Sequence, residues 1–230
     1  MLLALEKEFT TLEVSKRTLK RFFRKIGLSY KRAKKVIMKN SKWKNYFDKF
    51  IQLKMLREWV KEGLCELSFY DESGFSLNSN IPYRWSAVGT PALIPSIRFT
   101  KRINVLGFLN TDKKSVFYKM LTGKVDTDVV IGFFDEFAKQ IKKTTICVLD
   151  NASTHTSKKF KAKLQEWKEL GLHILYLPPY SPELNPIEML WREMKYTWTD
   201  LNAMDSFDNF HEHIKKMLDG FGSEYDINFG

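Results

Sequence analysis

Three acidic residues stand where carboxylates of an α/β protein could do chemistry together. Asp71 and Asp150 each follow a short apolar run, and Glu188 comes just after a proline-rich segment. Mixed α/β sheets bind ligands outside their strand ends, where these side chains would gather. Gathered carboxylates repel one another unless a cation lies between them, and Mg²⁺ prefers carboxylate and phosphate oxygens. A pair of such ions can hold the attacking and leaving oxygens of a phosphoryl displacement.

The two aspartates also have simple structural interpretations. Asp71 is followed directly by Glu72, and neighbours on a strand point to opposite faces, so the pattern leaves open which of the two faces a site. Asp150 is followed by Asn151, a pair that often forms an Asx turn before a helix. Taken singly, each aspartate fits a structural role as well as a chemical one.

Glu188 has the strongest structural alternative. With Asn185 as the N-cap and Pro186 at the first helical position, Glu188 would occupy the capping-box position of a helix. His155, five residues after Asp150, is equally compatible with an ordinary loop histidine. Because the chain has only four histidines and no paired cysteine motif, we exclude a zinc site.

The elements that would position these residues follow from hydrophobic periodicity. We expect a basic helix over 15–26 and a longer helix from Ser41 to Lys61, whose apolar members are Trp43, Tyr46, Phe47, Phe50 and Trp59. Alternating and apolar runs predict strands over 65–70, 83–88, 97–109, 115–121, 145–149 and 173–177. Amphipathic runs predict helices over 127–141, 157–170 and 185–198. This order predicts an α/β fold, a mixed sheet with helices on both faces.

Charge divides the chain into an arm and a body. The net charge is +11, yet residues 1–60 hold 17 basic and 5 acidic residues, so the remaining residues sum to −1. A basic arm on a neutral body suggests that the arm binds a polyanion, although a solubilising helical face would look the same. We therefore predict an arm over 1–40, a connecting helix over 41–63 and a body over 64–230.

Composition favours a globular protein and excludes one with a membrane-spanning helix. Hydrophobic residues make up 43% and charged residues 28%, as in globular proteins, and no apolar run approaches the roughly 18 residues of a membrane helix. Cys65 and Cys147 are far apart and outside any paired motif, so we expect two reduced thiols. We expect a cytoplasmic protein, associated with the nucleoid, that has no membrane partner.

The amino-acid sequences of several segments resemble those of one family. The segments are FYDESGF at 69–75, Trp85 with Gly89 and Pro91, LDNASTH at 149–155, LPPYSPELNPIE at 177–188 and Leu190-Trp191. In this order and at these spacings they resemble the catalytic domain of the mariner-superfamily DDE transposases, most closely the bacterial insertion-sequence branch. The resemblance covers the chain from about Leu64 onward.

This resemblance implies a ribonuclease-H-like fold and metal-dependent DNA cleavage and strand transfer. It implies the triad Asp71, Asp150 and Glu188, which would hold two Mg²⁺ ions that Mn²⁺ can replace, with Asn151 and His155 in support. The implied partners are double-stranded DNA, as inverted repeats and as target, and a second copy of the chain in a homodimer. A small-molecule substrate is not expected.

The arm resembles the last part of the family's second helix-turn-helix. The residues placed to reach DNA are Lys16, Arg17, Lys20, Arg21, Arg24, Lys31 and Arg32. The family carries a further helix-turn-helix before this point, so we expect a truncated copy, the second frame of a split gene or a late start codon. Two alternatives remain open: a catalytically silent DNA-binding remnant of a transposase, and a host nuclease of the ribonuclease-H type.

Overall fold

The structure is a computed structural model that describes residues 40–77, 101–179 and 181–229, together with Arg17, Thr18, Arg21 and Arg24. The chain divides into two compact units, Met1–Lys39 and Asn40–Gly230. In the first unit the four described residues are helical, and their side chains are exposed. The expected strand over 83–88 lies outside the described residues, as do Trp85, Gly89 and Pro91. So do four basic residues of the arm: Lys16, Lys20, Lys31 and Arg32.

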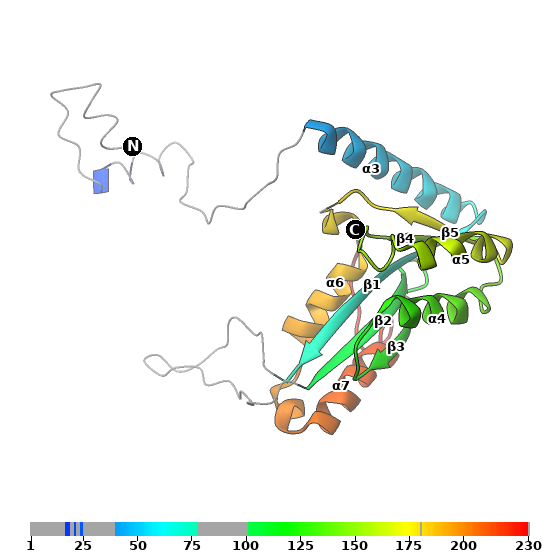
Figure 1. The fold of residues 1–230 in the computed structure, drawn as a ribbon. Helices are drawn as coiled ribbons and strands as arrows, with labels where there is room; N and C mark the ends of the chain where they lie inside the picture. Colours follow the sequence, from blue (N-terminus) through cyan, green and yellow to red (C-terminus); the bar gives the residue numbers. More distant parts are fainter. Residues whose placement is uncertain are drawn as a thin grey trace. The chain divides into compact units, whose positions relative to one another are not determined.

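One mixed sheet forms the centre of the second unit (Figure 1). Its strands are β1 (Glu66–Ser76), β2 (Arg102–Asn110), β3 (Ser115–Leu121), β4 (Thr145–Leu149) and β5 (Leu172–Tyr176), in the order β3-β2-β1-β4-β5. The first three strands along the chain are antiparallel neighbours, whereas β1, β4 and β5 run parallel. The parallel strands therefore end on the same side of the sheet.

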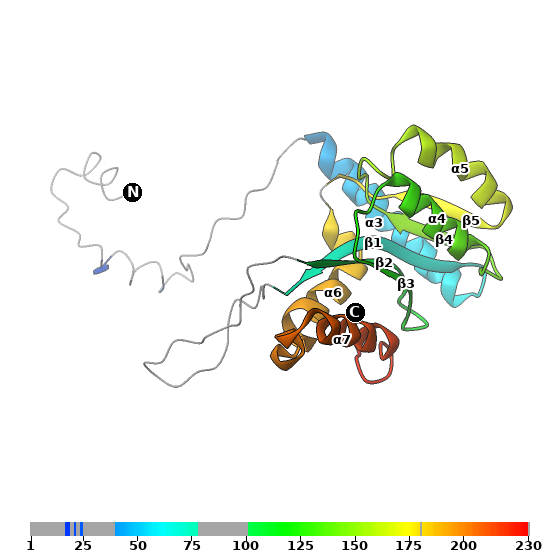
Figure 2. The ribbon, with the colours of Figure 1, turned by 60° about the horizontal axis from the view of Figure 1, so that its bottom comes forward.

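Helices cover both faces of this sheet, as the sequence predicts (Figure 2). They are α3 (Asn40–Lys61), α4 (Thr127–Ala138), α5 (Lys158–Glu169), α6 (Ile187–Glu193) and α7 (Phe207–Asp219). Helices α4 and α5 pack on one face, and α3, α6 and α7 pack on the other. Short 3₁₀ helices lie at Pro182–Leu184 and Leu201–Asp205, and α6 continues as a π-helix over Met194–Trp198. None of the helices described here is long and apolar enough to cross a membrane.

Capping residues explain where two helices begin. The Asp126 side chain accepts hydrogen bonds from the amides of Asp128 and Val129 at the start of α4. Ser157 accepts from the amide of Phe160 and begins α5, at the residue that the sequence indicates. The predicted bounds of β3 and β4 are confirmed to the residue.

Alternation along β1 divides the core into two clusters. Phe69 is buried against α6 and α7, and its neighbour Tyr70 is buried against α4 and α5. The thiols of Cys65 and Cys147 are buried and free, as expected. Strand β4 contributes to both clusters, which confirms that both of its faces are covered.

Strand β1 is longer than predicted, and its length positions the site. Its pairing with β4 stops at Phe69, opposite Val148, whereas its pairing with β2 continues to Ser76, opposite Arg102. The prediction that the strand ends before Asp71 is wrong, because β2 satisfies the backbone of the polar residues that follow. Asp71 therefore lies inside a strand, just beyond the point where β4 has ended.

Helix α3 is present, and Tyr46 packs against the core, but three of the five predicted apolar members are exposed. The helix begins at Asn40, so Ser41 lies within it, and the side chains buried against the sheet are those of Leu53 and Leu56. Phe47, Phe50 and Trp59, which we assigned to the apolar face, are exposed. Apolar residues occur all around this helix, so periodicity could not identify the buried side.

Candidate active site

The structure brings the three predicted carboxylates to one cavity. The cavity has a volume of about 380 Å³ and is lined by Asp71 from β1, Asp150 from the end of β4 and Glu188 from the first turn of α6. The remaining lining residues belong to the segments that follow β4 and β5: Asn151, Ala152, Leu177, Pro178, Pro179, Ser181, Pro182 and Asn185. The site thus lies at the carboxyl ends of the parallel strands, where ligands of such sheets bind.

Asp71 faces α6, on the side of the sheet that Phe69 shares. Its Oδ2 accepts a hydrogen bond of 3.1 Å from the indole Nε1 of Trp191. Burial raises the pKa of Asp71 well above its usual range, and the negative charges of Glu188 and Glu72 raise it further. A cation in the cavity would stabilise the ionised carboxylate of Asp71 and so oppose this rise in its pKa.

Glu72 faces the opposite side of the sheet and belongs to a polar chain. Its Oε1 accepts a hydrogen bond of 2.8 Å from the hydroxyl of Tyr70 and lies 3.0 Å from Nε2 of His155. The other ring nitrogen of His155, Nδ1, lies 2.8 Å from Oδ1 of Asp150. His155 is therefore a buried link between Glu72 and Asp150, not an isolated loop histidine.

Hydrogen bonds and neighbouring charges explain the pKa shifts of His155 and Asp150. Burial lowers the pKa of His155, but the hydrogen bonds and charges of Asp150 and Glu72 outweigh burial and raise it to about 9. The hydrogen bond from His155 in turn lowers the pKa of Asp150. At neutral pH, His155 is thus a cation held between two carboxylates, and Asp150 is ionised.

The loops that carry Asp150 are fixed by further hydrogen bonds. Asp150 Oδ1 accepts from the amide of Ala152 at 2.9 Å, so the expected Asx turn exists alongside the contact with His155. The amide group of Asn151 donates to the carbonyl of Leu177, and the Leu177 amide donates to the Leu149 carbonyl at 2.8 Å. These contacts hold the segment after β5 against the end of β4.

Glu188 does not have the capping role that the sequence suggested. Helix α6 begins at Ile187, Pro186 occupies the N-cap position, and no side chain caps the helix. Glu188 is exposed, at the rim of the cavity. Partial desolvation by the cavity wall raises the pKa of Glu188; the charge of Lys195 lowers it, and the charge of Asp150 raises it.

Three residues of this site were missed in the sequence analysis. Trp191 contacts Asp71, and Asn185 lines the cavity. Lys195 is close enough for its charge to act on Asp71 and Glu188, and its Nζ lies 5.3 Å from the centre of the Phe75 ring. Their spacing from Glu188 could have indicated Trp191 and Lys195, because residues three and seven positions along a helix share a face.

The donors at this cavity fit a hard divalent cation. The three acids offer carboxylate oxygens, which suit Mg²⁺ or Mn²⁺, and the one nearby histidine has both ring nitrogens engaged with carboxylates. Across the described residues, no three His, Cys, Asp or Glu side chains form a ready-made metal cluster. A cation bound here would therefore complete its shell with water or phosphate oxygens, as Mg²⁺ commonly does.

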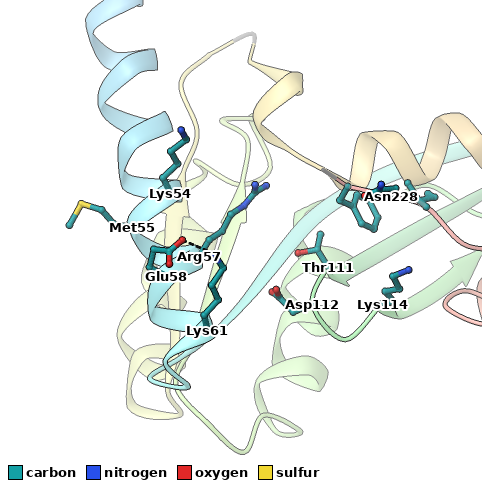
Figure 3. A pocket seen from close by; sticks show the side chains of 11 residues that line it. Lys54, Met55, Arg57, Glu58, Lys61, Thr111, Asp112, Lys114 and Asn228 are labelled. Atoms are coloured by element: carbon teal, nitrogen blue, oxygen red, sulfur yellow. Dashed lines mark hydrogen bonds and ion pairs between the residues drawn. The ribbon is translucent and has the colours of Figure 1, made fainter.

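A larger cavity lies at the other end of the sheet. It measures about 680 Å³ and lies between α3, the β2–β3 turn and residues 227–229 (Figure 3). Its charges are mixed: Glu58 pairs with Lys61 at 2.8 Å, and Asp112 is the other acid that lines it. This cavity lacks a group of carboxylates, so we place the candidate active site at the smaller one.

A family model identifies the body of the chain. The model of the DDE superfamily endonucleases matches residues 66–211, which is more than half of the chain and includes all three carboxylates. The chain belongs to the DDE superfamily endonucleases.

Solved structures agree with this assignment at the level of the fold. The Mos1 strand transfer complex is 19% identical and has a TM-score of 0.62, covering 96% of this chain and 71% of that one. The Mos1 mariner paired end complex with Mn is 17% identical, also with a TM-score of 0.62, covering 97% and 71%. These similarities confirm the expected ribonuclease-H-like fold of this DDE endonuclease.

A curated protein from Sinorhizobium fredii (strain NBRC 101917 / NGR234), the uncharacterized protein y4pE/y4sA, is also similar. It is 31% identical over 68 residues, which are 30% of this chain and 46% of that protein. The match thus spans less than half the length of this relative.

Proposed function

We propose that this chain is the catalytic part of a transposase of the bacterial insertion-sequence type. It hydrolyses phosphodiesters at the ends of a mobile element and joins the freed 3′ hydroxyls to target DNA. The observation that carries the proposal is the position of Asp71, Asp150 and Glu188 around one cavity of a DDE endonuclease. The Mos1 complexes are described as strand transfer and paired end complexes, which supports DNA as the substrate.

The three carboxylates take complementary parts in this proposal. Asp71, Asp150 and Glu188 would together hold two Mg²⁺ or Mn²⁺ ions in the cavity that they line. Bound there, the ions supply an activated nucleophile and stabilise the leaving oxygen. His155 keeps Asp150 ionised and oriented, and Asn151 fixes the loop beside it. Trp191 orients Asp71 through its indole N–H.

The basic arm supplies DNA binding. Arg17, Arg21 and Arg24 are helical and exposed, and their spacing of four and three residues places them on one face of a helix. Such a face can contact phosphates or base edges of double-stranded DNA. We further propose that two copies of the chain act together on two inverted-repeat ends, in the cytoplasm and at the nucleoid.

Nicking of DNA tests this function. The substrate is a supercoiled plasmid that carries this reading frame with its flanking DNA, incubated with the full chain and Mg²⁺ or Mn²⁺. We expect nicking by the wild type and none by Asp150→Asn, with DNA retention nearly unchanged. Asp208→Asn is the matched control, because it removes one exposed carboxylate from α7. Undiminished nicking by Asp150→Asn would overturn the triad.

A further inference from the structure

Asn185 lies between two of the proposed catalytic carboxylates. It is 4% exposed, precedes α6 by two residues and forms part of the wall of the carboxylate cavity. The sequence suggested a helix cap for this residue, but no side chain caps α6. A buried amide side chain that serves no helix end requires another explanation.

The orientation of the Asn185 amide group is fixed by its partner. Its Nδ2 donates a hydrogen bond of 3.1 Å to the backbone carbonyl of Tyr70. A carbonyl can accept but not donate, so the NH₂ group must face Tyr70 and the oxygen must face away. Oδ1 is then a buried acceptor that finds no donor among the described residues.

The same residue connects the segments that carry Asp71 and Glu188. Tyr70, which receives the side-chain bond, directly precedes Asp71 on β1. The backbone carbonyl of Asn185 accepts a hydrogen bond of 3.1 Å from the amide of Glu188. Its own backbone amide donates to the carbonyl of Pro182 at 2.9 Å, which anchors the loop. One residue thus sets the spacing between the strand of Asp71 and the turn of Glu188.

We propose that Asn185 is a positioning residue of the carboxylate site. Its NH₂ group holds the segments of Asp71 and Glu188 at the separation that a divalent cation needs. This inference rests on the proposed cation site and extends it by a residue that does not touch the ion.

A purely structural role would have different consequences. In that case Asn185 would stabilise the fold without affecting how the folded protein binds a cation. Asn110 offers a matched comparison, because it is also a buried asparagine, and its side chain accepts a bond of 2.9 Å from the amide of Lys113. Asn110 lies at the β2–β3 turn, next to Lys113, which pairs with Glu66 at the opposite end of β1 from the site.

The test is the affinity of the full chain for Mn²⁺, measured without DNA by the electron paramagnetic resonance signal of free Mn²⁺. Loss of a residue that supports metal ligands typically weakens affinity by 10- to 100-fold. We therefore expect Asn185→Ala to weaken Mn²⁺ binding about tenfold or more, and Asn110→Ala to leave it unchanged. Circular dichroism and urea unfolding show that each variant is folded under the conditions of the titration.

Two further variants distinguish failure of the positioning role from failure of the cation site. Asn185→Ser is used if the alanine variant does not fold, and its shorter side chain should weaken binding by a similar factor because it cannot reach Tyr70. Wild-type Mn²⁺ affinity in a folded Asn185 variant would overturn the positioning role. Wild-type affinity in Asp150→Asn would instead overturn the cation site on which this role depends.

Discussion

Nδ1 of His155 lies 2.8 Å from Oδ1 of Asp150, and this contact sets the charge of both groups. The histidine is buried, yet its pKa rises to about 9 because Asp150 and Glu72 bind its two ring nitrogens. The pair places an ionised Asp150 at the cavity while its neighbour Asp71 has a raised pKa. The pKa values of two aspartates of one site thus shift in opposite directions, because burial raises that of Asp71 and the hydrogen bond from His155 lowers that of Asp150.

His155→Gln should lose stability in a pH-dependent way. The folded-state pKa of about 9 exceeds the ordinary value of 6.5, so the stabilisation by His155 is complete below pH 6.5 and is lost as pH rises through about 9. This shift corresponds to roughly 3 kcal/mol. Urea unfolding at pH 6, 7.5 and 9.5 should show a difference from wild type that shrinks with pH. A constant difference would contradict the bridge, and His211→Gln on α7 is the control.

Asp71→Asn should stabilise the protein when divalent cations are removed. The raised pKa means that folded Asp71 keeps a proton that the unfolded chain releases, so stability decreases as pH rises above the unfolded value of 3.8. In EDTA at pH 7.5 we expect a higher melting temperature for the variant. Addition of Mn²⁺ should raise the melting temperature of the wild type but not of the variant. A variant less stable than wild type in EDTA would contradict this electrostatic account.

Trp191→Phe should remove the bond to Asp71 and preserve most of the packing around the ring. The loss of one hydrogen bond predicts a decrease of about 1 kcal/mol in the free energy of unfolding, together with slower nicking. Trp167→Phe is a close control, because its Nε1 donates to Asp135 Oδ1 at 2.7 Å on the other face of the sheet. If both variants nick DNA equally well, Trp191 is a packing residue and does not orient Asp71.

The arginines of the arm should control the salt dependence of DNA binding. Each phosphate contact contributes about 0.9 to the slope of log K against log salt concentration, because counterions are released. Replacing Arg17, Arg21 and Arg24 by alanine should therefore reduce the slope by up to about 3. Fluorescence anisotropy with a duplex from the flanking DNA measures the slope for both proteins. A slope that is unchanged, or absent in the wild type, would show that the arm is only a solvated face.

Local sequence signals were sufficient for much of the fold. The apolar run Thr145–Leu149 and the Ser157 cap identified β4 and the start of α5 because each depends on neighbouring residues alone. The family motifs also located Asp71, Asp150 and Glu188, which line one cavity. These features need no knowledge of which distant segments meet.

The sequence predictions that are wrong concern features that depend on contacts with segments distant in the sequence. Strand β1 extends beyond Asp71 because β2 pairs with it there. The periodicity of residues within β1 does not indicate which strand pairs with it. Asn185 looked like a helix cap, but its side chain binds the carbonyl of Tyr70, 115 positions earlier. The roles of His155 and Glu72 likewise depend on a contact across 83 positions.

Locating Mn²⁺ in crystals of the full chain by anomalous diffraction tests whether the three carboxylates hold a cation. We expect anomalous density in the cavity between Asp71, Asp150 and Glu188, with carboxylate oxygens of Asp71 and Asp150 in contact with the ion. Asp150→Asn crystals treated in the same way should show weaker density or none. Mn²⁺ bound elsewhere on the body, with this cavity empty at a concentration that supports nicking, would show that the three carboxylates are not the cation site.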